Sequence, residues 1–442
     1  MTQTSDARGT AVPSKRLSRL WHLGRATTDL AAGIGFTGLV DMARTRGGGQ
    51  PARIQLSPEH TRRFTDRLAK MRGAVMKMGQ LMSMDGSDIF TPEAAEIMAS
   101  LRDRAEPMPL SQLAQVLERE YGSGWDKGFK RFDFTPIASA SIGQVHRAET
   151  KDGRKLALKI QFPGVRDSID SDIDNLAFLG RSLGMAPKGI DIDPFLEEAR
   201  RQLHREADYA AEADAMDAYR ERIGNDEALF IPGVHRDLTT QSILAMDFAE
   251  GVPIDHLAGP DYRRAERDRA ATLLMRLTLR ELFELGLVQT DPNFGNYLYE
   301  ASNGRIVLLD FGATKPVSAK LVEQYRALAQ SALAKDRGAM RSACVALGYV
   351  GENDPSEHVD AMVDLLEMAA EPLKHPGHYD FGTSNLFERV YHSGRELFHS
   401  GAFTTAPAPD TMFLHRKFMG SFMLSRRLRA RVDLAEMART CI

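Results

Sequence analysis

Two runs of sequence decide the fold: Gly286-Leu-Val-Gln-Thr-Asp-Pro-Asn-Phe-Gly-Asn-Tyr-Leu-Tyr299 and Ile306-Val-Leu-Leu-Asp-Phe-Gly-Ala-Thr314. They predict a short strand at 297–300, a tight turn at Asn303-Gly304 and a second strand at 306–309, which together make a β-hairpin. Asp291 and Asn296 precede this hairpin and Asp310 follows it. Because the two ends of a hairpin lie side by side, we expect the three polar side chains near one another.

This pattern suits phosphoryl transfer from ATP, which depends on positioning and charge neutralisation more than on covalent help. In that chemistry an Asp orients the attacking group, an Asn five residues later binds one Mg²⁺, and the Asp of Asp-Phe-Gly binds the metal that bridges the phosphates. Asp291, Asn296 and Asp310 have this order and spacing. The ordinary kinase loop has His-Arg before its Asp, whereas this chain has Gln289-Thr290, which indicates an atypical kinase.

The composition is that of an ordinary soluble globular protein. The chain has 442 residues, enough for two or three domains, with 43% hydrophobic and 26% charged residues. A net charge of −3 shows no basic footprint, so nucleic acid is not an expected partner. The two cysteines have no metal-ligand spacing, which argues against a disulfide framework or a structural zinc site and favours a reducing compartment.

The first fifty residues predict a flexible or amphipathic tail that ends in a Gly-rich joint. Basic and apolar residues alternate over 15–25, which would suit an anionic membrane surface, and a solvated tail or a transit peptide are the alternatives. The longest apolar run, 30–40, is too short for a conventional spanning helix.

Three further regions follow the tail. Residues 51–131 predict a helical extension, 132–250 a kinase-like N-lobe, and 251–442 a mostly helical C-lobe with the catalytic loop and Asp-Phe-Gly. Together these elements predict an α+β fold of the bilobal protein-kinase type. Within the extension, Lys77 and Gln80 lie three residues apart, and this spacing alone is equally typical of an amphipathic surface helix.

In the N-lobe, the pattern from Phe132 onward predicts strand, loop, strand, tight turn and strand. Lys159 alternates with apolar neighbours on the third strand and is expected to face a nucleotide cleft. The first loop would cover the phosphates, but it reads Ala138-Ser-Ala-Ser141 instead of a glycine-rich sequence, which predicts an altered nucleotide preference or pose. We therefore take Ala138, Ala140 and Ser141 as nucleotide-binding residues.

A lysine on this strand needs a helix carboxylate to hold it, and a charged helix predicted over 193–223 offers Glu206 and Glu212. On one continuous helix Asp208 and Glu212 would share a face, whereas Glu206 and Glu212 would not, so spacing leaves the partner undecided. Further on, the backbone of Asp247, Phe248 and Ala249 is expected to bind an adenine edge in the linker between the lobes.

Asp-Phe-Gly is followed almost at once by a helix predicted to begin near Ser318, with no Ala-Pro-Glu signature. A long activation segment therefore has no room. Since that segment is the usual docking platform for a peptide, a conventional protein kinase is not expected.

Six ordered motifs resemble the UbiB family of atypical kinases, and within it the mitochondrial ADCK and yeast Coq branch that supports coenzyme Q synthesis. The resemblance covers about residues 55–440 and also includes the run Phe413-Leu-His-Arg-Lys-Phe-Met-Gly-Ser-Phe422. The six motifs are Lys77-Met-Gly-Gln80, Ala138-Ser-Ala-Ser-Ile-Gly-Gln-Val-His146, Leu158-Lys-Ile-Gln-Phe-Pro-Gly164, Glu206-Ala-Asp-Tyr-Ala-Ala-Glu212, Thr290-Asp-Pro-Asn-Phe-Gly-Asn296 and Leu309-Asp-Phe-Gly-Ala-Thr314.

The resemblance implies that the helix with Lys77 and Gln80 packs over the active-site cleft. It implies that Glu206 and Asp208 form the acidic motif facing Lys77, and that Glu212 is the partner of Lys159. It also implies binding of ATP (or ADP) with Mg²⁺, ATPase activity stimulated by membranes or lipid-like phenols, and support for isoprenoid quinone synthesis. One departure is Ser139, where these relatives have alanine.

The predicted function is an atypical kinase or ATPase that hydrolyses Mg-ATP and supports ubiquinone synthesis at a membrane. Membrane lipids, quinone precursors and quinone-synthesis enzymes are the expected partners. The expected location is peripheral to a membrane, in the bacterial cytoplasm or on the matrix side of a mitochondrion. Two alternatives stay open: a small-molecule kinase acting on a lipid-like metabolite, and a nucleotide-gated scaffold for a biosynthetic complex.

Overall fold

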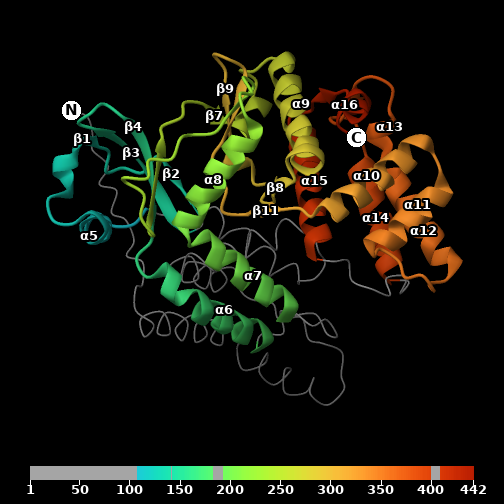
Figure 1. Cartoon of the computed structure of the whole chain (residues 1–442), viewed down its shortest axis with the longest axis horizontal. Coiled ribbons are helices and arrows are strands. Elements are labelled where there is room, and N and C mark those ends of the chain that lie inside the picture. Colours follow the sequence, from blue (N-terminus) through green and yellow to red (C-terminus); the bar gives the residue numbers. More distant parts are fainter. Residues whose placement is uncertain (1–106, 141, 183–192, 400–408) are drawn as a thin grey trace, which may run out of the picture. The chain divides into compact units, whose positions relative to one another are not determined.

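The computed structural model describes residues 107–140, 142–182, 193–399 and 409–442. They form two compact units (Figure 1). The first contains the described residues up to Ala213 together with Val234–Phe248, and the second contains Asp214–Gly233 and Ala249–Ile442. Lys77, Gln80, Ser141 and the tail at 1–50 lie outside the described residues.

The first unit is built on an antiparallel sheet with the strand order β1-β3-β4-β6, and a short strand, β2, pairs with β3. This confirms the strand, loop, strand, turn and strand predicted from Phe132, with the turn made at Gly153, whose φ is +90°. The strands are β1 (Phe129–Phe132), β2 (Ala138–Ser139), β3 (Gly143–Thr150), β4 (Lys155–Gln161) and β6 (Ile243–Asp247).

Gly143 is the first residue of β3, not a residue of the loop before it. A Cβ atom there would lie 2.4 Å from the Ile160 carbonyl oxygen on β4 and 3.0 Å from the Tyr209 hydroxyl. A side chain at this position would therefore push β3 away from β4. The glycine is explained by close strand packing, and no phosphate contact is needed to account for it.

The helices that follow the sheet correct one prediction. Residues 193–223 were expected to form one helix, but α7 (Asp193–Glu206) and α8 (Tyr209–Ile223) are separate. The break occurs because the Asp208 carboxylate accepts a hydrogen bond from the Ala211 amide at 3.1 Å, which caps a new helix instead of continuing the old one. The face argument for Asp208 and Glu212 on one helix therefore does not apply.

Three further helical segments belong to the first unit. They are α5 (Leu110–Tyr121), the single-turn η1 (Trp125–Gly128), and α6 (Val165–Ser182), which follows β4. α5 lies within 51–131, the region for which the sequence predicts helices.

In the second unit the predicted hairpin is confirmed. Tyr297 pairs with Leu308, Glu300 pairs with Arg305, and the turn contains Gly304 at φ +65°. The hairpin belongs to a sheet with the order β5-β10-β9-β7, and β8 pairs separately with β11. These strands are β5 (Leu229–Phe230), β7 (Val252–Pro253), β8 (Leu287–Gln289), β9 (Tyr297–Glu300), β10 (Arg305–Leu308) and β11 (Thr314–Pro316).

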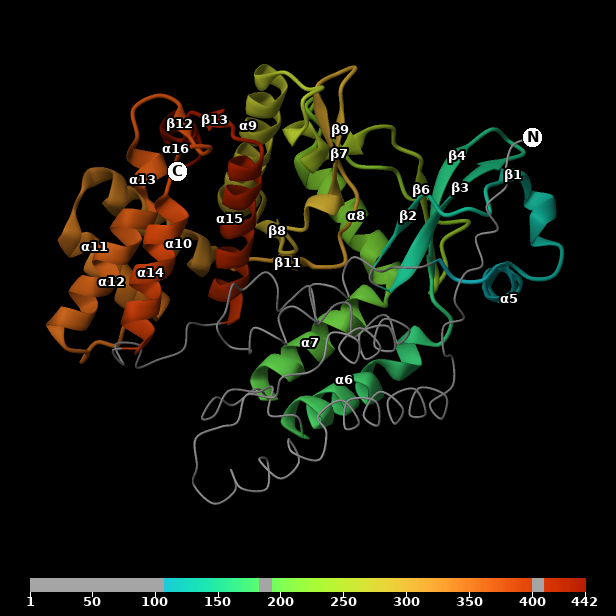
Figure 2. The same ribbon diagram turned by 180° about the vertical axis from the view of Figure 1, so that it is seen from behind.

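Helices supply most of the second unit. Figures 1 and 2 both show α15 lying next to α9, and apolar residues of α10, α11, α12 and α15 share one core with Val288 of β8. The helices are η2 (Ile254–Ala258), α9 (Arg264–Arg280), η3 (Glu281–Leu285), η4 (Phe294–Asn296), α10 (Ala319–Ala334), α11 (Arg337–Leu347), α12 (Ser356–Ala369), α13 (Glu371–Lys374), α14 (Leu386–His399), α15 (Pro409–Arg427) and α16 (Leu434–Cys441). A two-stranded pair, β12 (Tyr379–Asp380) with β13 (Arg431–Val432), lies among them.

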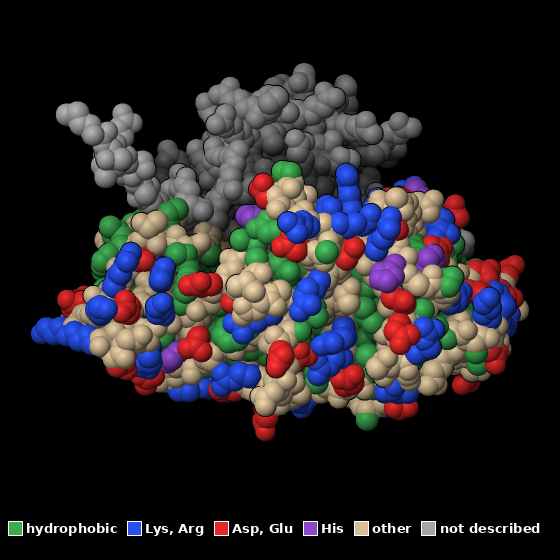
Figure 3. All heavy atoms as spheres, turned by 90° about the horizontal axis from the view of Figure 1, so that it is seen from above, with side chains coloured by type: hydrophobic (Ala, Val, Ile, Leu, Met, Phe, Trp, Pro, Cys, Tyr) green, Lys and Arg blue, Asp and Glu red, His purple; other side chains and the backbone are tan. Residues whose placement is uncertain are grey.

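Positive and negative side chains are interspersed over the face of the molecule seen in Figure 3, in keeping with the small net charge. None of the helices in the described ranges combines the length and the apolar character needed to cross a bilayer.

Candidate active site

The first unit holds Lys159 in a buried ion pair. Its Nζ donates to both carboxylate oxygens of Glu212, at 2.8 and 2.9 Å, and the two side chains are only 9% and 0% exposed. Lys159 lies on β4 and Glu212 in the first turn of α8, so the pair joins sheet to helix. The structure therefore selects Glu212 as the partner of Lys159, which spacing had left undecided.

Tyr209 packs against the Lys159–Glu212 pair, and it was not among the residues predicted from the sequence. Its fully buried ring lies 5.1 Å from Lys159 Nζ, a cation–π distance. The available signal was its position between Asp208 and Glu212 in the acidic motif. Of the other acidic residues, Glu206 accepts a hydrogen bond from Gln202 at 3.4 Å. Whether Glu206 and Asp208 face Lys77 falls outside the described residues.

The nucleotide-binding residues predicted around β2 and β6 have clear places. Ala138 and Ser139 are exposed on β2, and the Ala140 amide donates to Gly143 O at 2.9 Å. The Phe248 amide donates to Lys155 O at 2.9 Å, so it is already used in the sheet.

Contacts of the Asp247 and Ala249 backbones with an adenine edge stay predictions. The division between the units falls between Phe248 and Ala249, within the predicted linker. The Asp247 side chain is engaged with His235 at 2.8 Å.

The second unit brings the catalytic loop together with the residues after the hairpin. Asn296 Nδ2 donates to the backbone oxygen of Asp291 at 3.2 Å, and both residues are 8% exposed. The Gln289 side chain donates to the backbone oxygen of Asp310 at 3.1 Å. Thr290 is tied to Ala313 O by its amide at 3.1 Å and by its hydroxyl at 2.7 Å. Asp291, Asn296 and Asp310 are therefore held in one hydrogen-bonded framework.

The donor chemistry of this framework fits a magnesium-nucleotide site. The Asn296 amide group uses its nitrogen toward Asp291, which leaves its oxygen as the atom suited to a cation. One Asp310 carboxylate oxygen accepts from the Gly312 amide at 3.1 Å, which orients that side chain. Mg²⁺ typically takes one or two protein ligands and completes its octahedron with phosphates and water.

Metal sites made by protein side chains alone are not indicated elsewhere. Among the residues that the structure describes, no three or more His, Cys, Asp or Glu side chains cluster as such a site requires. A Mg²⁺ ion held by Asn296 and Asp310 would complete its coordination with water or phosphate oxygens.

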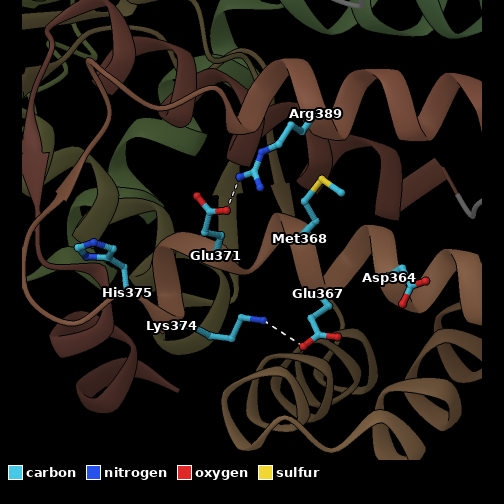
Figure 4. A pocket seen from close by; sticks show the side chains of 7 residues that line it. All are labelled: Asp364, Glu367, Met368, Glu371, Lys374, His375 and Arg389. Carbon is cyan, nitrogen blue, oxygen red and sulfur yellow. Dashed lines mark hydrogen bonds and ion pairs between the residues drawn. The ribbon is translucent and has the colours of Figure 1, made fainter.

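A groove of about 450 Å³ on the helical part of the second unit is a different kind of feature (Figure 4). Its charges are neutralised internally: Glu371 pairs with Arg389, and Glu367 pairs with Lys374 at 3.4 Å. It contains none of the predicted site residues, so it is not a candidate for the phosphoryl-transfer chemistry. The lining residues are Asp364, Glu367, Met368, Glu371, Lys374, His375 and Arg389.

Comparison with known proteins decides the family. A family model described as the ABC1 atypical kinase-like domain matches residues 100–344. The mitochondrial atypical kinase COQ8 of Saccharomyces cerevisiae is 34% identical over 438 residues, which cover 97% of this chain and 85% of the yeast protein. The chain belongs to the UbiB, or ABC1, family of atypical kinases. The mitochondrial atypical kinase COQ8B of Rattus norvegicus is 33% identical, with 98% and 82% of the two chains covered.

A solved chain from Mycobacterium tuberculosis, described as the complex structure of Rv3197-erythromycin, has a TM-score of 0.61 and 24% identity. The match covers 87% of this chain and 95% of that one, and it shows that the two share a fold. The predicted kinase-like α+β fold and the predicted membership of the UbiB family are both confirmed.

Family membership makes this UbiB kinase an enzyme of the kinase type, and it implies use of ATP and Mg²⁺ in general. The yeast and rat relatives are both named as mitochondrial proteins. The individual roles of Lys159, Glu212, Asp291, Asn296 and Asp310 remain predictions.

Proposed function

We propose that this UbiB kinase binds Mg-ATP and transfers or hydrolyses its terminal phosphoryl group in support of isoprenoid quinone synthesis. In the first unit, Lys159 grips the phosphates and Glu212 holds Lys159. In the second unit, Asp291 orients the attacking water or hydroxyl while Asn296 and Asp310 bind the metal. The observation that carries this proposal is the framework in which Asn296 bonds to Asp291 and Gln289 bonds to Asp310.

The proposed roles of these residues follow from the negative charge of the phosphoryl group. A phosphoryl group in transit carries negative charge on its equatorial oxygens, and a lysine and metal ions neutralise it. Lys159 is held in one direction because both Glu212 oxygens accept from its Nζ, at 2.8 and 2.9 Å. Asp291 and Asn296 are largely removed from water, which strengthens their electrostatic effect on a bound substrate.

Water is the preferred acceptor because the chain lacks the long segment on which protein kinases dock a peptide. Residue 312 ends Asp-Phe-Gly, β11 occupies 314–316, and α10 begins at Ala319 with Ser318 as its N-cap. A peptide therefore finds no docking segment between β11 and α10.

The experiment measures nucleotide turnover in the full chain with and without anionic liposomes, and in a chain lacking the first fifty residues. Asp291→Asn is the test variant. Asp364→Asn is the matched control, because that carboxylate belongs to the same unit but is 63% exposed and pairs only with the surface Arg337. Turnover should fall by at least about 10²-fold in Asp291→Asn and stay unchanged in Asp364→Asn. Equal turnover in the two variants would remove Asp291 from the mechanism.

The link to quinone synthesis is tested by the isoprenoid quinone content of cells that lack their own relative and carry either form of this chain. Restored quinone with the wild-type chain and none with Asp291→Asn supports the enzymatic proposal. Full restoration by Asp291→Asn would favour a nucleotide-gated scaffold. Appearance of a phosphorylated lipid-like metabolite would instead identify a small-molecule kinase.

A further inference from the structure

Helix α15 carries the run Phe413–Phe422, which entered the family resemblance without acquiring a role. It begins more than a hundred residues after the catalytic loop, yet the two are in contact within the second unit. Leu414 of α15 and Val288 of β8 belong to the same apolar core, and both ribbon views place α15 close to α9 (Figures 1 and 2).

The closest contact joins Gly420 to Pro292, the residue directly after Asp291. A Cβ atom added at Gly420 would lie 2.0 Å from Pro292 Cβ and 2.6 Å from its Cγ. An ordinary contact between two carbon atoms is about 3.5 Å, so the ring or the helix would have to move by more than about 1 Å. The helix backbone therefore forms the surface on which the proline ring rests.

One turn earlier, Lys417 enters the same region from α15. Its Nζ lies 2.7 Å from the Glu281 carboxylate in η3, 3.3 Å from the Tyr297 hydroxyl and 3.4 Å from the Gln289 side-chain oxygen. Burial opposes a charged lysine, but Glu281 and Tyr297 outweigh it and raise the pKa of Lys417 above its ordinary value. The charged form of Lys417 is therefore favoured at the base of the catalytic loop.

The Lys417 contacts continue to the catalytic residues. The Tyr297 hydroxyl donates to the Gln289 side-chain oxygen at 2.9 Å, and the nitrogen of the same amide donates to Asp310 O at 3.1 Å. Glu281 also accepts from the Gln289 backbone amide at 3.2 Å. Lys417 and Glu281 thus fix Gln289 from its side chain and its backbone at once.

A third contact comes from the same face of α15. The hydroxyls of Ser421 and Thr278 lie 2.8 Å apart, and both residues are buried. Thr278 belongs to α9, the helix that continues into η3 and carries Glu281 next to it. α15 is therefore held against α9 where it touches the loop.

From these contacts we infer that α15 positions the catalytic loop for phosphoryl transfer, with Gly420 and Lys417 as positioning residues that act through Pro292 and Gln289. The inference rests on the proposed role of Asp291. Gly420 sets where Pro292 lies, and Lys417 sets where Gln289 and the Asp310 backbone lie. A displacement of about 1 Å at the reacting groups can cost about 10²-fold in rate, so such a support is a condition for turnover.

Gly420→Ala is the test, and Gly394→Ala is its matched control. Both replace a glycine in a helix of the second unit, but a Cβ at Gly394 would meet only Leu365 Cδ2 at 3.9 Å. In Gly420→Ala, kcat for Mg-ATP turnover should fall by about 10-fold to 10²-fold while KM for ATP stays within about twofold. Amide hydrogen exchange over 287–296 should accelerate. Gly394→Ala should match the wild type in all three measurements.

A second comparison applies if Gly420→Ala does not fold. Pro292→Gly removes the ring that the new methyl would overlap, so the double variant should turn over ATP at the rate of Pro292→Gly alone. A further loss in the double variant would show that Gly420 acts by another route and would overturn the inference, as would equal kcat and exchange in Gly420→Ala and Gly394→Ala.

These results separate the inference from the proposed function. If Asp291→Asn retains full turnover, the proposed function fails, and accelerated exchange over 287–296 in Gly420→Ala still reports the contact. If Asp291→Asn is inactive but Gly420→Ala behaves as Gly394→Ala does, only the inference fails.

Discussion

Among the residues that the structure describes, each of the two units contains a buried lysine–glutamate pair, and the two pairs have different surroundings. Lys159 and Glu212 meet at 2.8 Å in the first unit, and Lys417 and Glu281 meet at 2.7 Å in the second. A hydrophobic substitute of similar volume is often at least as stable as a buried ion pair, so neither pair is explained by stability alone. Their surroundings show what each charge is for.

Lys159 lies at a strand position beside the Tyr209 ring, and its Nζ donates two hydrogen bonds to the Glu212 carboxylate. Lys417 instead faces Glu281, Tyr297 and Gln289, which are all protein groups of the second unit. We propose that the first arrangement orients a cation toward the nucleotide and that the second uses a cation to hold a loop. A lysine buried against a glutamate is therefore no signature of catalysis until its other neighbours are known.

Substitution of Lys159 should have the largest effect on Mg-ATP turnover. Lys159→Met removes the charge that neutralises the phosphates, so turnover of Mg-ATP should fall by at least about 10²-fold. Steady-state kinetics and a nucleotide-binding titration measure this, with Lys155→Met on the exposed end of the same strand as control. Turnover in Lys159→Met equal to that of Lys155→Met would place the phosphates elsewhere.

Lys417→Met should act on stability first. It leaves the Glu281 carboxylate buried without its cation, which typically costs about 3–5 kcal/mol of unfolding free energy. Denaturant unfolding at neutral pH measures the loss, and the folded fraction that remains should bind ATP with the wild-type affinity. Lost nucleotide affinity in folded Lys417→Met would mean that both lysines act on the nucleotide, which contradicts the difference proposed between them.

Gly143→Ala tests whether the close pairing of β3 and β4 supports Lys159. Its methyl group would lie 2.4 Å from the carbonyl oxygen of Ile160, which is next to Lys159 in the chain, so β3 and β4 must separate. Overpacking of this kind costs about 1–3 kcal/mol. We expect lower thermal stability together with weaker nucleotide binding. Gly128→Ala, at the end of η1, is the control, because a Cβ atom there would meet no atom within 4 Å and the residue has no positive φ. Unchanged nucleotide affinity would show that the orientation of Lys159 does not depend on the close pairing of β3 and β4.

Substitutions in surface ion pairs should have the smallest effect on stability. Partial burial acts to raise the pKa of Glu371, but hydrogen bonds from Arg389 and Tyr379 outweigh it, so the folded-state pKa lies below that of a free glutamate. A depressed pKa contributes stability above the unfolded value, near pH 4.5, and that stability is lost as the pH falls through the folded value.

Because Glu371 is 38% exposed, solvent screening keeps its contribution to about 0.5 kcal/mol or less. Glu371→Gln should therefore lower stability slightly at pH 7 and leave it unchanged well below the folded pKa. Equal losses at both pH values would assign the effect to lost packing instead of charge.

Local pattern was sufficient for the hairpin and its flanking polar residues. Residues 286–314 combine a turn signal, two short apolar runs and a fixed spacing, and the two strands of the hairpin pair within this segment. The Lys159–Glu212 pair needed the family resemblance, because its partners are 53 residues apart and several carboxylates were available.

Two other features were missed for different reasons. The break between α7 and α8 was missed because periodicity continues across Asp208, whose local capping bond to Ala211 starts a new helix. The contacts of α15 were missed because Lys417 and Gln289 are 128 residues apart, and a helical Lys or Gly has no spacing signal for a distant loop. A local cap decided the first feature and long-range packing decided the second.

We propose that Asn296 and Asp310 hold the metal of a bound nucleotide. Calorimetric titration of ATP into the full chain, with and without Mg²⁺, tests this directly. Wild-type protein should bind ATP at least about tenfold more tightly with Mg²⁺. In Asp310→Asn, with Asp364→Asn as control, that enhancement should disappear while metal-free ATP binding persists. An undiminished Mg²⁺ enhancement in Asp310→Asn would contradict the account.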